Sequence, residues 1–290
     1  MRLLFFIVFI LLFFLKYSFA LEVRVIAPQE NEIENVIYKD SILSIILSIY
    51  DIENEIEIKV YKKDKIIFED KVKNENKEIT YKIDINIDES FQDITELNIF
   101  IIGNNEAIVK KIKIIYDEEL LNNLAKKFIN NYFRYKGKIL KVKNYPISVY
   151  VPNQFLDIVS EAIKFFEQYC KLKFIITDNK NNSDIIFKDM THIFMLDRLA
   201  DCEYIILSSD FHYFYIRNII RLYSFFNQLK NNQSDKHYFN FAIKIVAHEL
   251  GHALGINGHT SDHSIMHPMD NEIMILFPYQ QQAIKRVYNK

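Results

Sequence analysis

The sequence contains no tryptophan and only two cysteines, and its 290 residues include just five glycines and five prolines. The absence of tryptophan excludes the Cys-Trp-Cys signature of antibody domains. Two cysteines are too few for a zinc site built from thiolates, which needs more of them. Cys170 and Cys202 leave two states open, a single disulfide or two buried free thiols.

An excess of charge of either sign is also missing. Lysine and arginine number 36, aspartate and glutamate number 38, and the net charge is −2, with no long basic run. Nucleic-acid binding therefore has no electrostatic support. Half of the residues are hydrophobic and 26% are charged, which is typical of a folded chain with ample core. The length allows one large domain or two of ordinary size.

One long hydrophobic run opens the chain, "LLFFIVFILLFFL" at residues 3–15. Arg2 precedes this run, and the small residues Ser18 and Ala20 follow it, as at a signal-peptide cleavage site. A helix of this length is about 20 Å long, which is short of the ~30 Å hydrocarbon core of a membrane. We therefore predict a signal peptide over residues 1–20 and a secreted or extracytoplasmic protein. An uncleaved N-terminal membrane anchor is the alternative.

Residues 22–117 alternate between hydrophobic and polar side chains in short runs. A period of two, clearest in "EIEIKV" at residues 55–60, predicts strands with one buried face. Seven such runs, separated by Asn, Asp and Lys turns, predict an N-terminal all-β domain over residues 21–117, an immunoglobulin-like sandwich. The expected strands are residues 22–28, 42–51, 55–63, 65–72, 78–87, 96–103 and 107–117.

From residue 118 onward the hydrophobic spacing becomes helical and alternates with short strands. This order predicts a second, C-terminal α+β domain over residues 118–290. The expected helices are residues 118–135, 155–171, 213–229, 239–255 and 279–290. The expected strands are residues 145–152, 173–177, 184–189 and 203–209.

The segment "HELGH" brings together three residues with the chemistry of a metal site. His248 and His252 are four apart on a predicted helix, so they share a face and can bind one zinc ion at about 2.0–2.1 Å. Glu249 lies about 100° around the helix from His248. Its carboxylate can there take a proton from a water molecule whose pKa zinc lowers towards ~7. A plain histidine pair on a helix surface would give the same five letters.

The residues that flank "HELGH" favour a metal site over a plain pair of histidines. Gly251 allows another segment to approach the helix closely, and Gly255 can adopt the left-handed conformation that ends it. "HELGHALG" followed by "SIMHP" resembles the metzincin clan of zinc endopeptidases, and most closely its matrixin-like branch. The resemblance implies a metzincin-like zinc peptidase domain with His248 and His252 as ligands. It also implies Glu249 as the general base and acid, and Met266 as the floor of the zinc site.

The third ligand departs from that pattern. The matrixin-like spacing places it at position 258, which here is Gly258, and His259 follows at once. The distance along the chain from His248 to Met266 matches the pattern, so the loop gains one residue before the histidine and loses one after it. Gly258 can adopt the backbone angle that a longer turn needs. We predict His259 as the third ligand of one catalytic zinc ion. The remaining candidates are His263 and Asp262.

Other features give weaker expectations. Asp184 could contribute to a structural calcium site, but a single carboxylate is not such a site. His267 is expected to line the zinc site without binding the metal. The apolar loop of residues 268–278 is expected to line the pocket for the side chain after the cleaved bond. No cysteine-switch prosegment of the matrixin type occurs, so latency of that kind is not expected.

Together these features predict an exported zinc metalloendopeptidase. Its partner would be a protein or peptide substrate. The resemblance implies that the substrate extends beside an edge strand of the catalytic sheet, such as residues 203–209. A membrane partner is expected only if the N-terminal segment is retained, and the oligomeric state stays open. The alternative, from a different class, is a secreted or surface adhesion protein whose metallopeptidase-like domain is inactive.

Overall fold

The computed structural model describes residues 21–28, 35–50, 55–73, 78–103, 106–193, 198–226, 236–262, 264–268 and 274–288. The predicted signal peptide over residues 1–20 lies outside this part. The chain divides into two compact units. The first is made of Met1–Asn35 and Leu43–Tyr116, and the second of Val36–Ile42 and Asp117–Lys290.

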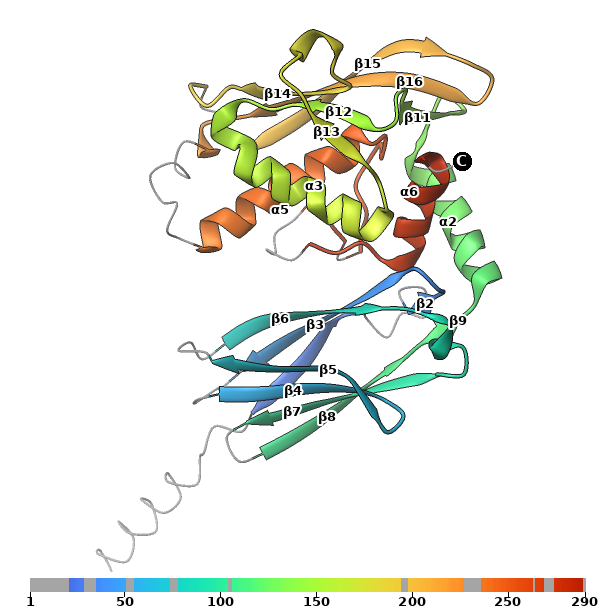
Figure 1. Cartoon of the computed structure of the whole chain (residues 1–290), viewed down its shortest axis with the longest axis vertical. Helices are drawn as coiled ribbons and strands as arrows, with labels where there is room; N and C mark the ends of the chain where they lie inside the picture. Colours follow the sequence, from blue (N-terminus) through green and yellow to red (C-terminus); the bar gives the residue numbers. More distant parts are fainter. Residues whose placement is uncertain are drawn as a thin grey trace, which may run out of the picture. The chain divides into compact units, whose positions relative to one another are not determined.

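The first unit consists of two antiparallel sheets (Figure 1). A three-stranded sheet has the order β1-β3-β6, and a four-stranded sheet has the order β5-β4-β7-β8. The strands are β1 (Glu22–Ala27), β3 (Ile42–Tyr50), β4 (Glu55–Lys62), β5 (Lys65–Lys73), β6 (Glu78–Asn86), β7 (Glu96–Gly103), β8 (Glu106–Lys113) and the short β9 (Ile115–Tyr116), with a 3₁₀ turn η1 at Glu89–Phe91. All seven long strands were predicted from the alternation of the sequence.

The alternation places one row of side chains in the core of this unit. In β4, Ile56, Ile58 and Val60 are fully buried, while the residues between them are partly or wholly exposed. β3 is buried along nearly all of its length, which a simple period of two does not predict.

The second unit is a mixed α/β structure with a large, mainly parallel sheet. The strand order is β10-β11-β16-β14-β12-β13, and β15 pairs with β16 as an antiparallel edge strand. The strands are β10 (Arg134–Tyr135), β11 (Lys138–Val142), β12 (Ile147–Tyr150), β13 (Phe174–Ile176), β14 (Ile185–Asp189), β15 (Ala200–Ser209) and β16 (Tyr213–Leu222), together with the short β2 (Val36–Ile37).

The helices of this unit pack against the sheet and against one another (Figure 1). They are α2 (Glu118–Tyr132), α3 (Leu156–Cys170), α5 (Lys236–Ala253) and α6 (Pro278–Tyr288), with 3₁₀ turns η2 (Asn153–Phe155) and η3 (Lys180–Asn182). α2 begins where Asp117 caps it, since its carboxylate accepts a hydrogen bond of 2.8 Å from the backbone N–H of Leu120. These four helices were predicted to within a few residues.

One predicted helix is wrong. Residues 213–229 were expected to be helical, but Tyr213–Leu222 forms strand β16. The residues with almost no exposure there are Ile216, Asn218, Ile220 and Leu222, which follow a period of two. Isoleucine and aromatic residues fit a pleated, half-buried surface well, and pairing with β11, β14 and β15 decides the structure. The short strands β10 and β11 were not predicted at all.

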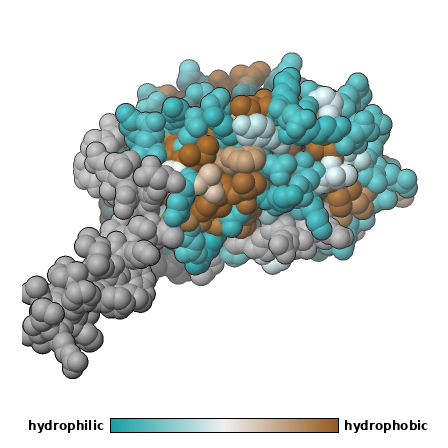
Figure 2. All heavy atoms as spheres, turned by 90° about the horizontal axis from the view of Figure 1, so that it is seen from below, coloured by the Kyte–Doolittle hydropathy of each residue, from teal (hydrophilic) through white to brown (hydrophobic). Residues whose placement is uncertain are grey.

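The surface combines hydrophilic side chains with separate hydrophobic patches, as the face in Figure 2 shows. Among the described residues, no helix is long and apolar enough to cross a membrane.

Candidate metal centre

Helix α5 presents the three residues of the "HELGH" segment near its C-terminal end. Ala242, Val246 and Leu250 of this helix are fully buried in the core of the unit, which fixes the helix against the sheet. His248 and His252 lie one turn apart on the side that faces the loop after the helix.

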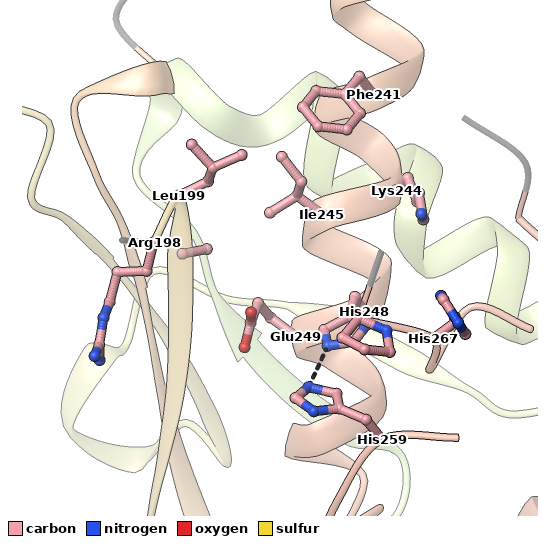
Figure 3. A pocket seen from close by; sticks show the side chains of 11 residues that line it. Arg198, Leu199, Phe241, Lys244, Ile245, His248, Glu249, His259 and His267 are labelled. Carbon is pink, nitrogen blue, oxygen red and sulfur yellow. Dashed lines mark hydrogen bonds between the residues drawn. The ribbon is translucent and has the colours of Figure 1, made fainter. Parts of the chain in front are cut away.

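Three histidines converge on one point. The Nε2 atoms of His248 and His252 are 3.1 Å apart. Those of His248 and His259 are 3.2 Å apart (Figure 3). Ligand nitrogens arranged tetrahedrally around a zinc ion, at ~2.0–2.1 Å each, lie about 3.3 Å from one another. The three histidines therefore form a group that can hold a metal ion. Among the described residues it is the only group of this kind.

The hydrogen bonds of the rings show why a cation fits there. His248 Nδ1 lies 2.8 Å from the carbonyl oxygen of Ile265, and His252 Nδ1 lies 2.7 Å from that of Ile256. A carbonyl oxygen only accepts, so each Nδ1 carries the hydrogen and each Nε2 of the neutral ring presents a lone pair. Two lone pairs 3.1 Å apart repel each other unless a positive charge lies between them. The same Nδ1 contacts hold the rings in place as metal ligands require.

Burial keeps these rings neutral. It lowers the pKa of His248 to about 4, with the nearby His252 adding to the effect. Burial also lowers the pKa of His252. Both rings are therefore unprotonated at neutral pH, which is the form that binds a metal.

The loop after α5 depends on two glycines in unusual conformations. Gly255 has φ +99° and ends the helix, and a Cβ there would lie 2.3 Å from the carbonyl oxygen of Leu140 in β11. Gly258 has φ +132°, a value that residues with a side chain rarely adopt. Gly258 thus adopts a backbone angle of the kind expected for it, and His259 lies next to it in the metal group.

Met266 lies directly beneath the helix that carries the ligands. It is fully buried, and a Cβ at Gly251 would lie 2.3 Å from its Sδ atom. A glycine at this position leaves room for the thioether as it stands, and a larger residue would require the end of the Met266 side chain to move. Met266 therefore packs against the helix that carries His248 and His252.

Asp262, one of the alternative third ligands, is engaged in holding the loop. One carboxylate oxygen accepts hydrogen bonds from Thr260 Oγ1 at 2.7 Å and Ser264 N at 3.0 Å. The other accepts from Tyr279 OH at 2.7 Å and Gln280 Nε2 at 2.9 Å, both in α6. The other alternative, His263, lies outside the described residues.

Glu249 lies beside the metal group and faces strand β15 (Figure 3). It is only 8% exposed. Burial raises the pKa of its carboxyl group to about 8, and the negative charge of Asp201 adds to the effect. It borders a cavity of about 400 Å³ that is also lined by Leu199 and Ala200 at the start of β15 and by Phe241 and Ile245 of α5.

The expected lining of this cavity is only partly correct. His267 lines it and does not belong to the metal group, as predicted. Of the described part of the apolar loop 268–278, only Pro268 borders the cavity. Ile275, Leu276 and Phe277 are instead buried in the core, just before α6 begins. Residues 269–273 lie outside the described part.

Two other expectations concern Asp184 and the cysteines. The carboxylate of Asp184 accepts hydrogen bonds from Asn144 Nδ2 at 2.7 Å and from Ser148 N and Oγ at 2.9 and 2.5 Å. These contacts tie the loop before β12 to β14, so the residue has a structural role and belongs to no metal group. Cys170 and Cys202 are free thiols.

Neither a search against models of protein families nor a search of curated proteins found a match to this chain. The function therefore has to be inferred from the chemistry of the site itself.

Proposed function

We propose that this chain is an exported zinc-dependent endopeptidase. In this proposal, His248, His252 and His259 hold the zinc ion, and Glu249 moves the proton. The second unit is a metzincin-like catalytic domain, and the first is an immunoglobulin-like sandwich. The observation that carries the proposal is the convergence of three Nε2 atoms beside one buried carboxyl group.

The donor set favours zinc over other ions. Three neutral imidazoles leave a fourth position open, which is the arrangement of catalytic zinc sites. Magnesium and calcium prefer oxygen ligands and would not select three nitrogens. A zinc ion bound there supplies a Lewis acid that polarises the scissile carbonyl group and makes a bound water more acidic.

Glu249 has the position and the proton affinity of a general base. Its carboxylate lies next to the ligands but is not one of them. Burial raises its pKa into the range where a carboxyl group can both take and return a proton near neutral pH. In the proposed reaction, Glu249 takes a proton from the attacking water and gives it to the departing amine.

Strand β15 supports a peptide as the substrate. It runs from Ala200, at the cavity, to Ser209 and pairs on one side with β16. Its other edge can accept an extended peptide through main-chain hydrogen bonds, as edge strands do in peptide recognition. This strand contains residues 203–209, the edge strand expected from the sequence, and begins three residues earlier.

Two features support the assignment of the first unit. Its two sheets have three and four strands, in the orders β1-β3-β6 and β5-β4-β7-β8. β1 pairs with β3, and β4 pairs with β5 and β7, in antiparallel fashion, as do β7 and β8. Seven strands in two sheets are the basic plan of immunoglobulin-like sandwiches.

The test is digestion of casein by residues 21–290, loaded with zinc, beside Glu249→Gln. The proposal predicts cleavage by the first, and a loss of about 10²–10⁴-fold in the second, which keeps the shape of the side chain but removes the base. Both proteins should bind zinc equally. A chelator should stop the cleavage, and added zinc should restore it.

The alternative is a secreted adhesion protein with an inactive metallopeptidase-like domain. Retention of both Glu249 and the three-histidine group speaks against it, since adhesion requires neither. Folded, zinc-loaded protein that cuts neither casein nor a peptide library would favour this alternative and overturn the proposal.

A further inference from the structure

The hairpin formed by β15 and β16 ends in an apolar tip. Phe211, in the turn between the strands, is 86% exposed, more than any other large hydrophobic residue described. Ile205, Ile206 and Leu207 precede it in β15 and are between 41% and 49% exposed. Edge strands of soluble proteins usually carry charges or proline at such positions. Ser208, Ser209 and Asp210 separate Phe211 from these aliphatic residues, so Phe211 is the one large apolar side chain at the turn itself. Such an exposed aromatic side chain is typical of a surface with a binding partner.

The tip is held rigidly rather than left loose. Both backbone N–H groups of His212 and Tyr213 donate to one carboxylate oxygen of Asp210, at 2.8 and 2.7 Å. The hydroxyl of Tyr215 donates to the other oxygen at 2.7 Å. These bonds engage the only acidic side chain in the turn, and the Phe211 side chain beside it stays exposed.

A second, basic hairpin lies beside this tip. β11 runs parallel to β16, and the N–H of Ile139 donates to the carbonyl oxygen of His212 at 3.0 Å, so the turns before both strands lie at the same end of the sheet. Residues 134–143, "RYKGKILKVK", contain five lysines and arginines and no acidic residue.

The cations of the basic hairpin contact neutral groups. Arg134 donates to Asn130 Oδ1 and to the carbonyl oxygen of Gly137. Lys136 lies over the ring of Tyr135, and Lys138 over that of Phe214. Lys138 also donates to the carbonyl oxygen of Asp210. As far as the structure describes the chain, none of these three cations forms an ion pair with a carboxylate.

We propose that this tip docks on the anionic surface of a lipid bilayer. Phe211 enters the interface, and Lys136 and Lys138 lie among the headgroups. Insertion of apolar side chains together with basic residues is the pair of signals that holds a protein reversibly on a membrane. The tyrosines around the tip, such as Tyr135, Tyr204 and Tyr213, suit the boundary between headgroups and hydrocarbon.

The charge pattern favours a bilayer over a second copy of the chain. The net charge of the whole protein is −2, so attraction to an anionic surface has to come from this local cluster. A symmetric pair formed through the tip would bring two clusters of the same sign together, which opposes association.

Docking would also orient the proposed active site. β15 leads from Ala200, which lines the cavity, to the turn that holds Phe211. This extended stretch spans at most about 40 Å. The cavity would therefore lie within that distance of the bilayer. Its substrates would then be proteins whose cleaved segment is close to a membrane surface. The docking itself does not depend on the proposed peptidase activity.

The test is flotation of residues 21–290 with vesicles of phosphatidylcholine alone and of phosphatidylcholine mixed with phosphatidylglycerol. Binding to the mixed vesicles and release by salt are expected. Phe211→Ser should lower the partition about tenfold or more, because a buried phenyl ring is lost from the interface. The double variant Lys136→Gln/Lys138→Gln should lower it about thirty-fold, because each lysine near an anionic surface contributes about 1 kcal/mol.

Matched controls exist elsewhere in the chain. Val109→Ser removes another exposed apolar side chain, and Lys63→Gln/Lys65→Gln removes lysines at the same spacing. Lys63 and Lys136 both have positive φ, at 53° and 48°, so the two double variants carry the same backbone strain. Neither control should change the partition. Glu249→Gln should float like the wild type, which separates docking from catalysis.

Three results would overturn the proposal. One is no flotation of folded protein with anionic vesicles at low salt. Another is flotation that Phe211→Ser and the double lysine variant leave unchanged. The third is a concentration-dependent dimer, seen by analytical ultracentrifugation, that Phe211→Ser abolishes, because the tip would then bind a second copy instead.

Discussion

At the scale of single residues, the spacing of two histidines and the backbone angle of one glycine determine the metal group. His248 and His252 share a helix face through the i, i+4 rule alone, so their proximity could be predicted from the sequence. His259 reaches the metal group through a loop of unusual shape. Gly258 indicated this loop in the sequence, because only glycine adopts φ +132° readily. The engagement of Asp262 by four donors could not be foreseen, since its partners in α6 are distant in sequence.

The first prediction concerns Gly255, which ends the ligand helix. Gly255→Ala should cost about 3 kcal/mol or more, because the added Cβ meets the Leu140 carbonyl oxygen at 2.3 Å in addition to the strain of a positive φ. Gly137→Ala is the matched control, with φ +82° and no atom within 4 Å, and should cost about 1 kcal/mol. Urea unfolding of both variants measures the difference. Equal losses would show that the close approach to β11 is not present in solution.

A second prediction concerns the two thiols. Burial raises the pKa of Cys170 to about 12, and it raises the pKa of Cys202 well above its usual value. Both should therefore resist a thiol reagent such as Ellman's reagent in the folded protein. After unfolding without reductant, both should react. Finding no reactive thiol after unfolding would mean that the two cysteines form a disulfide.

At the scale of elements, amphipathic periodicity was a reliable guide where one face of an element is buried. It identified the four helices of the second unit and the strands of the first. It failed for β16, where a run of aromatic and branched residues fits either a buried helix or a buried strand. The partners of β16 decide the outcome, and they come from β11, β14 and β15, which local sequence does not reveal.

The loop between α5 and α6 carries the third prediction. Asp262→Ala should weaken zinc binding about 10–100-fold although this residue is no ligand, because it positions the segment that holds His259 and Met266. Titration against a fluorescent zinc chelator measures the affinity. Asp210→Ala is the matched control, since it also removes an aspartate that organises a turn, but one distant from the metal group.

If Asp262→Ala left the zinc affinity unchanged, the loop would not need this carboxylate to place His259. If Asp210→Ala weakened zinc binding as much as Asp262→Ala, the effect would reflect general loss of structure instead.

At the scale of the whole molecule, the predicted boundary between residues 117 and 118 misses one feature. Val36–Ile42 belongs to the second unit although the first unit surrounds it in sequence. The backbone N–H and carbonyl of Ile42 bond to the side chain of Gln281, at 3.0 and 2.7 Å, and Gln281 has no exposed surface. Such an excursion of the chain leaves no trace in composition or periodicity.

The fourth prediction follows from this excursion. A fragment of residues 118–290 should be less stable than the same unit within residues 21–290, because Gln281 loses buried partners and the side chain of Ile42 leaves the core. The loss should be about 2–5 kcal/mol. Thermal unfolding followed by circular dichroism measures it. A fragment with the melting temperature of the full chain would show that Val36–Ile42 is dispensable.

The central claim is that the three histidines hold one zinc ion, and the most direct measurement is the zinc content of purified protein after dialysis against a weak chelator. Residues 21–290 should retain about one zinc ion per chain. His212→Ala, which removes an exposed histidine in the β15–β16 turn, should retain the same amount. His259→Ala should lose most of its zinc under the same conditions. Wild-type protein without zinc, or His259→Ala with a full complement, would contradict the account.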